Sequence, residues 1–370
     1  MSTTTLSPAT ASPTSTTIPT CTTPKPGENG YLPPEACDVI LYYVPSFGAA
    51  VLFCVLYGLL MIAHGVQGVI YKKRYTWVIV MGALWELLAF IFRSLQTRQQ
   101  NEERWDTAYT ILFLLAPLWI NAFLYMTIGR LIYFFIPDKR LAGITAKRYG
   151  QLFVWLDIVA FLVQAVGAVM TTDTQATNAE VMRGVHIYMG GIGLQELFIL
   201  IFSGLAVHLH RRMISMERMG QLDEEKLHEG KMPWRWLFYA MYAALFMITI
   251  RIVFRLAQYA DGTNPKNPVL THEWYEYVWD ALPMFIAIGL LNIFHPGRVL
   301  QGPDSEFPKL SRKEKKQMKR DKKEAKKALE EFNSRARLAG GIEFEQLRRQ
   351  EEGDMGLSGG SFAPINSHSR

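Results

Sequence analysis

The 370-residue chain has few charged residues and very few cysteines, and each shortage excludes a class of protein. Charged residues make up 19% of the chain, whereas 49% of it is hydrophobic. Three cysteines cannot form the framework of a disulfide-rich secreted domain. Cys54 lies inside an apolar run, where a packing role is expected. Cys21 and Cys37 precede that run, and they could either pair, if their segment is extracellular, or remain free thiols.

Motifs for catalysis and cofactor binding are also missing. The sequence has no nucleophile elbow, no P-loop and no dinucleotide-binding fingerprint. Some seven-helix membrane hydrolases hold zinc with histidines and an acid, so the histidines near apolar runs are candidate metal ligands. No two of them form an H-x-x-x-H pair on a buried helical face. We therefore predict no enzyme, no metal site and no cofactor. The histidines near apolar runs are His64, His186, His208, His210 and His295.

What the chain has instead is seven apolar runs of roughly twenty residues, the length that crosses a hydrocarbon core of ~30 Å. Several runs are apolar on every side, which helices of a soluble core are not. Trp and Tyr lie at many of the run ends, as expected for an aromatic belt at the lipid–water interface. The predicted fold class is all-α, a polytopic bundle of seven transmembrane helices. The spans cover about residues 44–70, 77–95, 109–135, 151–170, 185–207, 236–258 and 275–294.

The distribution of Lys and Arg among the loops predicts the orientation. The first, third and fifth loops are rich in them, whereas the second, fourth and sixth carry only Arg98, Arg104, Arg183 and Lys266. Because basic loops stay in the cytoplasm, we predict an extracellular N-terminus and a cytoplasmic C-terminus. The predicted parts are an extracellular, disordered Ser/Thr/Pro-rich segment, a membrane domain and a cytoplasmic basic tail. They cover residues 1–42, 43–297 and 298–370.

One stretch of the tail accounts for the formal net charge of +6. The stretch Lys309–Lys327 contains eleven Lys or Arg residues and three acidic ones, a local net charge of +8. The rest of the chain is close to neutral, so nucleic acid is not a predicted partner. Two interpretations of the stretch stay open. It is either a solvated tail that satisfies the positive-inside rule or a segment that binds anionic phospholipid.

Ionisable side chains inside the predicted spans are costly in lipid, so they are expected to face the bundle interior. In the second, sixth and seventh spans they share one helical face, and the predicted orientation places most of them in the outer third of the membrane. We predict that these three spans are neighbours and that their charges form a nearly neutral network. The network consists of Glu86, Arg93, Arg251, Arg255, Gln258, Glu276 and Asp280.

A second polar group is predicted in the third, fourth and fifth spans. Arg130 and Asp157 lie at matching depth near the cytoplasmic side, and Gln164, Gln195 and Glu196 lie nearer the midplane. Two compatible interpretations apply to the buried charges. They either fix packing as interhelical pairs, or they line a polar cavity, open to the outer leaflet, that recognises a zwitterionic or amine-bearing head group.

With these positions in view, the chain resembles the fungal lipid-translocating exporter family of the resistance-to-aminocholesterol (RTA-like) type over about residues 31–297. Short blocks carry the resemblance, each on its proper span. They are Glu86–Arg93, Leu115-Ala-Pro117 with Ala122, Tyr125, Gly129 and Arg130, Asp157 with Gln164 and Gly167, Gly190–Gln195, Arg251–Arg255, Glu273 with Tyr277 and Asp280, and His295-Pro-Gly297. The family commonly has Gly and Tyr in place of Ala89 and Phe90, and Glu in place of Gln258.

The resemblance implies a plasma-membrane protein linked to sphingoid-base release, lipid asymmetry or tolerance of amphiphilic and sterol-directed toxins. Its implied partners are membrane lipids and a lipid or amphiphilic small molecule. The main hypothesis is a transporter or exporter of a sphingoid-base or sterol-like amphiphile. The alternative is a receptor-like sensor of lipid or membrane stress that has the same seven-helix topology.

Overall fold

The computed structural model describes residues 24–25, 27–33, 40–41, 43–171, 177–223, 226–227, 230–260, 262, 267–302 and 305–307, and isolated positions between 313 and 334. The chain divides into two units, Met1–Phe307 and Pro308–Arg370, and the first contains the helical bundle. Cys21, Cys37 and about half of the stretch Lys309–Lys327 lie outside the described residues, so the disulfide and phospholipid predictions stay untested.

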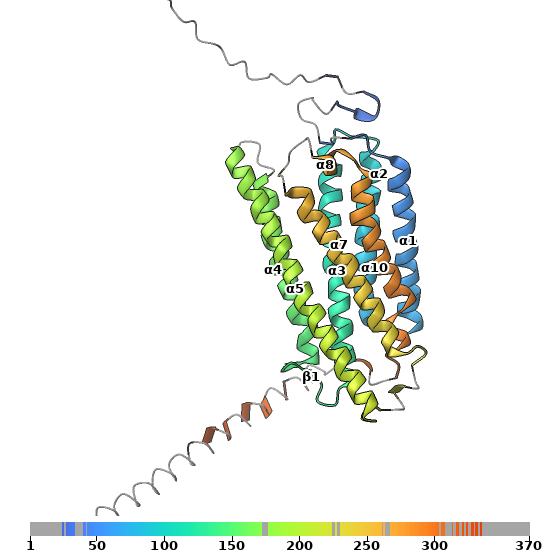
Figure 1. Ribbon diagram of the computed structural model, residues 1–370, viewed down its shortest axis with the longest axis vertical. Helices are drawn as coiled ribbons and strands as arrows, with labels where there is room; N and C mark the ends of the chain where they lie inside the picture. The colour runs from blue at the N-terminus through green and yellow to red at the C-terminus, as the bar shows by residue number, and fades with distance from the viewer. Residues whose placement is uncertain are drawn as a thin grey trace, which may run out of the picture. The chain divides into compact units, whose positions relative to one another are not determined.

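Seven helices in the described part of the chain are long and apolar enough to cross a membrane (Figure 1). This confirms the predicted all-α class. Six spans are the single helices α1 (Phe47–Ile70), α2 (Trp77–Gln96), α3 (Glu103–Phe135), α4 (Ala146–Thr171), α5 (Asn178–Arg218) and α7 (Trp234–Tyr259). The last span joins α9 (Trp274–Glu276), the π-turn η3 (Tyr277–Ala281) and α10 (Leu282–Ile293).

Short elements connect the spans. A two-stranded hairpin of β1 (Arg140–Leu141) and β2 (Ile144–Thr145) follows α3 and turns through Ala142 and Gly143 at φ of 47° and 77°. Positive φ at both central residues is what a two-residue hairpin turn requires. The others are η1 (Glu28–Gly30), η2 (Arg74–Thr76), α8 (Pro268–Thr271) and η4 (Pro296–Arg298).

The helix α5 differs most from its predicted span of 185–207. It begins at Asn178 behind a capping box, in which Thr177 and Glu180 each bond the other's backbone N–H. It continues to Arg218, through residues that the sequence assigned to a loop. Hydropathy marks where the apolar side chains end, whereas a helix continues until a residue such as Gly220, at φ 64°, interrupts it.

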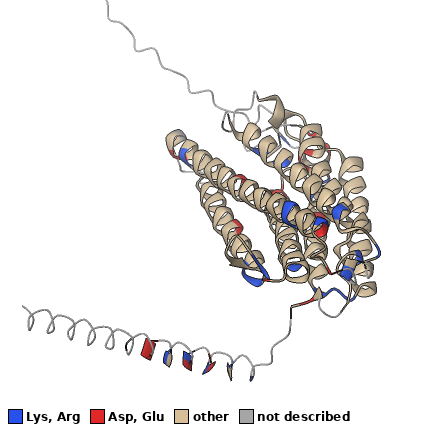
Figure 2. Cartoon of the chain, turned by 60° about the horizontal axis from the view of Figure 1, so that its bottom comes forward, with Lys and Arg blue, Asp and Glu red and all other residues tan. Residues whose placement is uncertain are grey.

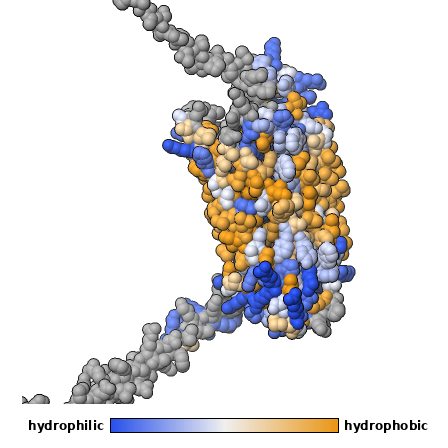
Figure 3. All heavy atoms as spheres, viewed as in Figure 1, coloured by the Kyte–Doolittle hydropathy of each residue, from blue (hydrophilic) through white to orange (hydrophobic). Residues whose placement is uncertain are grey.

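Neighbours in the chain pack against each other, and α10 returns to α1, so the seven spans form a closed ring. The ring is tightest between α4 and α5, where a Cβ on Gly167 would lie 2.3 Å from the backbone nitrogen of Tyr188. Such small residues allow close helix approach in lipid. The outward faces are apolar, and the orange band between two bluer ends in Figure 3 shows this on one side of the bundle.

The bundle has two ends, an N-side and a C-side. The N-side is the end at which α1, α3, α5 and the last span begin, and the C-side is the end at which they finish. Most of the helical ribbon is tan in Figure 2, and the few charged positions inside helices stand out against it. These buried charges gather on the N-side half of α2, α7 and the last span.

Candidate functional site: a charged network and cavity on the N-side

Arg93 of α2 reaches from its own helix to the start of the last span. Its Nη2 lies 3.1 Å from Glu273 Oε1 and 3.7 Å from Glu276 Oε2. The same guanidinium donates to the Tyr43 hydroxyl and, at 2.7 Å, to Gln96 Oε1. Arg93 is therefore a buried cation whose partners come from three separate segments of the chain.

Arg251 of α7 is held by two carboxylates and one carbonyl. Its Nη1 lies 2.5 Å from Asp280 Oδ1 and 3.8 Å from Glu86 Oε1, and its Nη2 donates at 2.8 Å to the carbonyl oxygen of Phe113. That carbonyl cannot accept the usual helical hydrogen bond, because the residue four positions later is Pro117, which has no N–H. Neighbouring helices often satisfy such carbonyls in membrane proteins.

Arg255, one turn after Arg251, completes the network. It forms an ion pair with Asp280 and lies 3.9 Å from Glu276 Oε1. Its Nη1 also donates to Gln258 Oε1 at 3.4 Å. Glu276 thus lies near two arginines, but neither guanidinium comes closer to it than 3.7 Å. Its side chain is 17% exposed, whereas that of Asp280 is fully buried.

The irregular start of the last span positions Asp280. The π-turn η3 ends two residues before Pro283, whose ring would clash with the carbonyl four residues earlier, inside η3, in a regular helix. Widening the turn relieves this clash, and π-turns inside helices are frequent at functional sites. The Tyr57 hydroxyl of α1 donates to the Ala281 carbonyl at 2.8 Å, so a neighbouring helix supports the turn.

A cavity of about 190 Å³ lies beside the network on the N-side. Arg93, Arg255, Gln258 and Glu276 line it, together with Asp106 of α3. Apolar walls come from α3, α8 and the segment before α1. These lining residues include Ile40, Leu41, Phe113, Val269 and Leu270.

The network and cavity together contain more acids than bases. Three arginines face five carboxylates, a formal excess of two negative charges when all are ionised; the acids are Glu86, Asp106, Glu273, Glu276 and Asp280. Outside the spans, burial raises the pKa of Glu273 despite the nearby Arg93 guanidinium. Burial likewise raises the pKa of the Tyr43 hydroxyl, which keeps it a proton donor. The arrangement can accept a cationic group and exchange hydrogen bonds with hydroxyls.

The structure brings all seven residues of the predicted network together. The predicted contact among the second, sixth and seventh spans is more limited than their charges suggest. The helix α7 packs on α10, but α2 packs chiefly on α1 and α3 and reaches the others through long side chains. Sequence reasoning missed Tyr43, Gln96 and Asp106. Asp106 was missed because the third span was predicted to begin at residue 109, after the polar first turn of α3.

The second predicted group does not form one cluster. Asp157 accepts hydrogen bonds from Asn121 at 3.0 Å and from the Tyr125 hydroxyl at 2.9 Å, both on α3. Arg130 lies elsewhere, with its guanidinium 3.7 Å from the centre of the Tyr75 ring. The pairing expected from matching depth is absent among the described contacts, because neutral donors and an aromatic face take the place of the opposite charge.

The other members of that group form separate interhelical hydrogen bonds. Gln164 of α4 donates to Gln195 of α5 at 2.9 Å, and Thr249 of α7 donates to Glu196 of α5 at 3.0 Å. Among the described residues, no group of three or more His, Cys, Asp or Glu side chains could hold a metal ion. Gln164, Gln195 and Glu196 therefore link α4 to α5 and α5 to α7 in pairs.

Residues 79–303 match the model of the family described as RTA1 like protein. The chain belongs to the RTA1-like family. It is 63% identical over 310 residues to an Emericella nidulans protein named probable lipid transporter atnI, covering 84% of this chain and 81% of that protein. Saccharomyces cerevisiae proteins named sphingoid long-chain base transporter RSB1 are 28% identical over 294 residues, or 72% of this chain and 75% of theirs.

A further Saccharomyces cerevisiae relative, named Protein RTA1, is 24% identical over 284 residues, which are 68% of this chain and 85% of the relative. No solved structure matches the chain. These matches confirm the family resemblance seen in the sequence. The matched region runs from α2 to the turn after η4, so it contains every residue of the predicted network. This RTA1-like chain is a multi-pass membrane protein.

Proposed function

We propose that this RTA1-like protein transports a membrane lipid or amphiphile that carries a protonated amine, of the sphingoid long-chain base type. The names of its relatives support lipid transport, and the acidic excess of the N-side network and cavity taken together supports a cationic head group. A positive charge on the ligand would bring the network closer to neutrality, which favours binding in a site of low dielectric. We assign the protein no catalytic activity.

The observation that carries the proposal is the position of Glu276. Its carboxylate lines the cavity, yet both arginines near it stay at 3.7 Å or more. A ligand ammonium can therefore approach it without breaking a short ion pair. Gln258 and Tyr43 also line the cavity and can bond the hydroxyls of the head group. The apolar residues of the wall would contact the start of the alkyl chain.

We further propose that the N-side faces the outside of the cell, in the plasma membrane. The basis is the excess of Lys and Arg in the C-side loops, which the positive-inside rule places in the cytoplasm. In this orientation the cavity would lie in the outer leaflet, where an exporter must release its substrate.

The test is flux of a fluorescent long-chain base across reconstituted vesicles that contain the full-length protein. Glu276→Gln keeps the shape of the side chain and removes its charge, and we expect flux to fall about tenfold, as loss of one charge-assisted hydrogen bond predicts. The matched control is Glu102→Gln, on the same side but paired with exposed Arg104. We expect this control to transport like the unmodified protein.

Three results would count against the proposal. Equal flux for Glu276→Gln and the unmodified protein would exclude Glu276 from the substrate site. Equal losses for Glu276→Gln and Glu102→Gln would point to a general effect of charge at this end. Binding of the base without movement above empty vesicles would favour the receptor-like alternative.

A further inference from the structure

A second cavity, of about 410 Å³, lies on the C-side, at the opposite end of the bundle from the candidate substrate site. Lysines surround it, and one carboxylate faces them. Its lining residues include Tyr71, Lys72, Lys73, Lys231, Gly297 and Glu306. The charged residues among them are three cations and one anion, which is the reverse of the excess on the N-side.

Lys72 occupies a position where glycine would be unstrained. The last turn of α1 closes with a pair of hydrogen bonds, from Lys72 N to Val69 O at 3.2 Å and from Lys73 N to Gly68 O at 3.1 Å. This is the Schellman arrangement, and its left-handed residue is usually Gly. Here it is Lys72, at φ 53°. Strained backbone of this kind concentrates at ligand sites.

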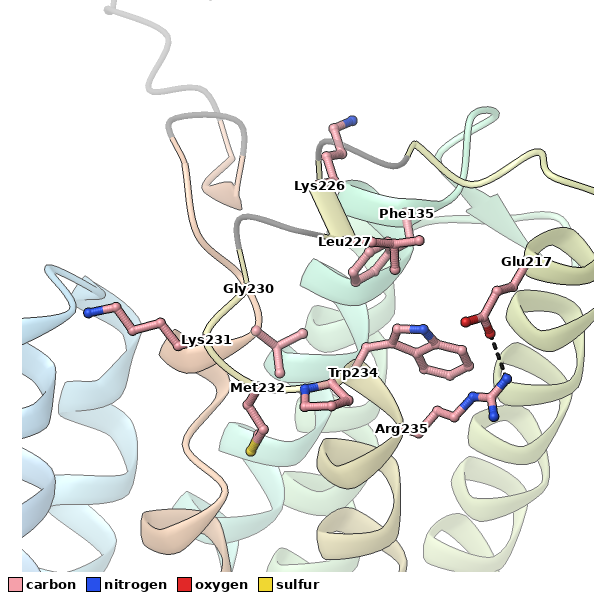
Figure 4. A pocket seen from close by; sticks show the side chains of 11 residues that line it. Phe135, Glu217, Lys226, Leu227, Gly230, Lys231, Met232, Trp234 and Arg235 are labelled. Atoms are coloured by element: carbon pink, nitrogen blue, oxygen red, sulfur yellow. Dashed lines mark hydrogen bonds and ion pairs between the residues drawn. The ribbon is translucent and has the colours of Figure 1, made fainter.

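Two further lysines are held in place around the cavity. Lys73 is buried and donates to the Ser305 hydroxyl, which keeps the segment after η4 against the end of α1. Lys231 is fixed through its backbone, because its N–H donates to the Arg298 carbonyl at 2.8 Å. Figure 4 shows the Lys231 side chain extending away from Trp234 and Arg235, toward the blue ribbon of α1.

Gly297 of the His295-Pro-Gly297 block also lines this cavity. A Cβ on Gly297 would lie 2.6 Å from the Tyr71 Cβ, so only glycine allows η4 to approach α1 this closely. The ring of His295 stacks on Tyr71 with centroids 5.3 Å apart, and its Nδ1 accepts from Gly297 N at 3.0 Å. The His295-Pro-Gly297 block takes no part in the N-side network, but it packs η4 against the end of α1 beside this cavity.

The adjoining cavity of Figure 4, about 430 Å³, shares Lys231 and is likewise lined by three cations and one anion, but its other two cations are paired. There Arg235 pairs with Glu217 at 2.8 Å, and Lys226 lies 3.6 Å from Asp223. Lys72 and Lys231, by contrast, form no ion pair with any described residue, and both are exposed. Unpaired cations around one cavity attract an anion, so the cavity of Lys72 is the better candidate.

We propose that this C-side cavity binds a phosphate group, carried by the head group of an acidic phospholipid. The ammonium groups of Lys72 and Lys231 contact the phosphate as point charges, and the tightly packed turn at Gly297 sets the depth of the cavity. Basic pockets between membrane helices on the cytoplasmic side bind phosphorylated head groups. The site is separate from the proposed transport site, and it also differs from the basic stretch Lys309–Lys327.

The experiment measures thermal stabilisation of the purified full-length protein in neutral detergent. The probes are dioctanoyl phosphatidylinositol 4-phosphate, the same lipid without its 4-phosphate, and inorganic phosphate. The double substitution Lys72→Gln/Lys231→Gln removes the two unpaired cations. The matched control, Lys147→Gln/Arg211→Gln, removes two exposed C-side cations outside the cavity. A third variant neutralises the lysines of 309–327.

We expect the 4-phosphate lipid to stabilise the unmodified protein and the control equally. Its apparent Kd should rise about 30-fold in the double variant, because each lysine near an acidic head group contributes a factor of about five. Stabilisation by inorganic phosphate at similar concentration would identify a free anion as the source. Unchanged affinity in the double variant, or loss of binding only in the tail variant, would overturn the proposal.

Discussion

Replacing Arg251 by Met tests whether the buried network holds the bundle together. The substitution keeps an unbranched, apolar side chain like the stem of arginine and removes the charge that faces Glu86 at 3.8 Å. Asp280 retains Arg255 as a partner, so the loss falls mainly on Glu86, whose two oxygens accept no other hydrogen bond from the described residues. The carboxylate of Glu86 would be left buried without a cation.

The magnitude follows from the geometry. Two unit charges 3.8 Å apart interact by about 4 kcal/mol at an effective dielectric constant of ~20. Removing one partner of a buried ion pair typically destabilises a protein by about 3–5 kcal/mol, a range that includes this interaction energy. We therefore expect Arg251→Met to lower the free energy of unfolding by about 4 kcal/mol, and Arg251→Met/Glu86→Gln to recover much of it, because the uncompensated charge is gone.

The assay is the melting temperature of purified protein in detergent, read by the fraction that remains monodisperse after heating. Arg235→Met is the control, because its pair with Glu217 is half exposed and such pairs contribute about 0–1 kcal/mol. The pairing of Glu86 with Arg251 is not what stabilises the bundle if Arg251→Met and Arg235→Met have the same melting temperature. The same conclusion follows if adding Glu86→Gln to Arg251→Met recovers none of the lost stability.

Two further substitutions test helix packing and the proline in α3. Gly167→Ala places a Cβ 2.3 Å from a backbone nitrogen of α5 and should destabilise the protein by about 1–3 kcal/mol or more. Gly193→Ala has open space around it and should keep the melting temperature of the unmodified protein. Equal melting temperatures for the two variants would contradict the close approach of α4 and α5. Pro117→Ala returns an N–H to the Phe113 carbonyl, which then competes with Arg251 for that oxygen. We expect an unchanged or higher melting temperature but lower flux in vesicles. Normal flux would show that the hydrogen bond to the Phe113 carbonyl does not position Arg251.

Much of the fold could be predicted because lipid imposes one requirement on every span. A run of about twenty apolar residues must be helical, since no other open structure satisfies its backbone in hydrocarbon. Four spans consequently match their helices to within three residues at each end. The ends of α3, α4 and α5 were predicted less well, because helical turns such as Glu103–Asp106 continue into polar sequence. Hydropathy detects lipid contact, and capping residues decide where the helix ends.

The N-side network could be predicted for a similar reason. A charge in a span must find a partner, and few opposite charges lie at the same depth. Arg251 and Asp280 meet because almost nothing else can satisfy them. Asp157 shows the limit of this reasoning, since Asn121 and Tyr125 satisfy it without any charge. Depth predicts which groups are able to meet, but neutral donors on the adjacent helix are too common in sequence to be singled out.

The least predictable contact is also the one that best explains the position of the network. A single proline removes one backbone N–H in α3, and the carbonyl four residues earlier then becomes an acceptor for Arg251. The sequence contains both halves of this contact, but their pairing depends on how α3 and α7 are rotated. Pro283 likewise interrupts the regular helix of the last span, where the π-turn η3 directs Asp280 toward the arginines. Each proline disturbs its helix where a charge must be positioned, so the irregularities of α3 and of the last span belong to the site.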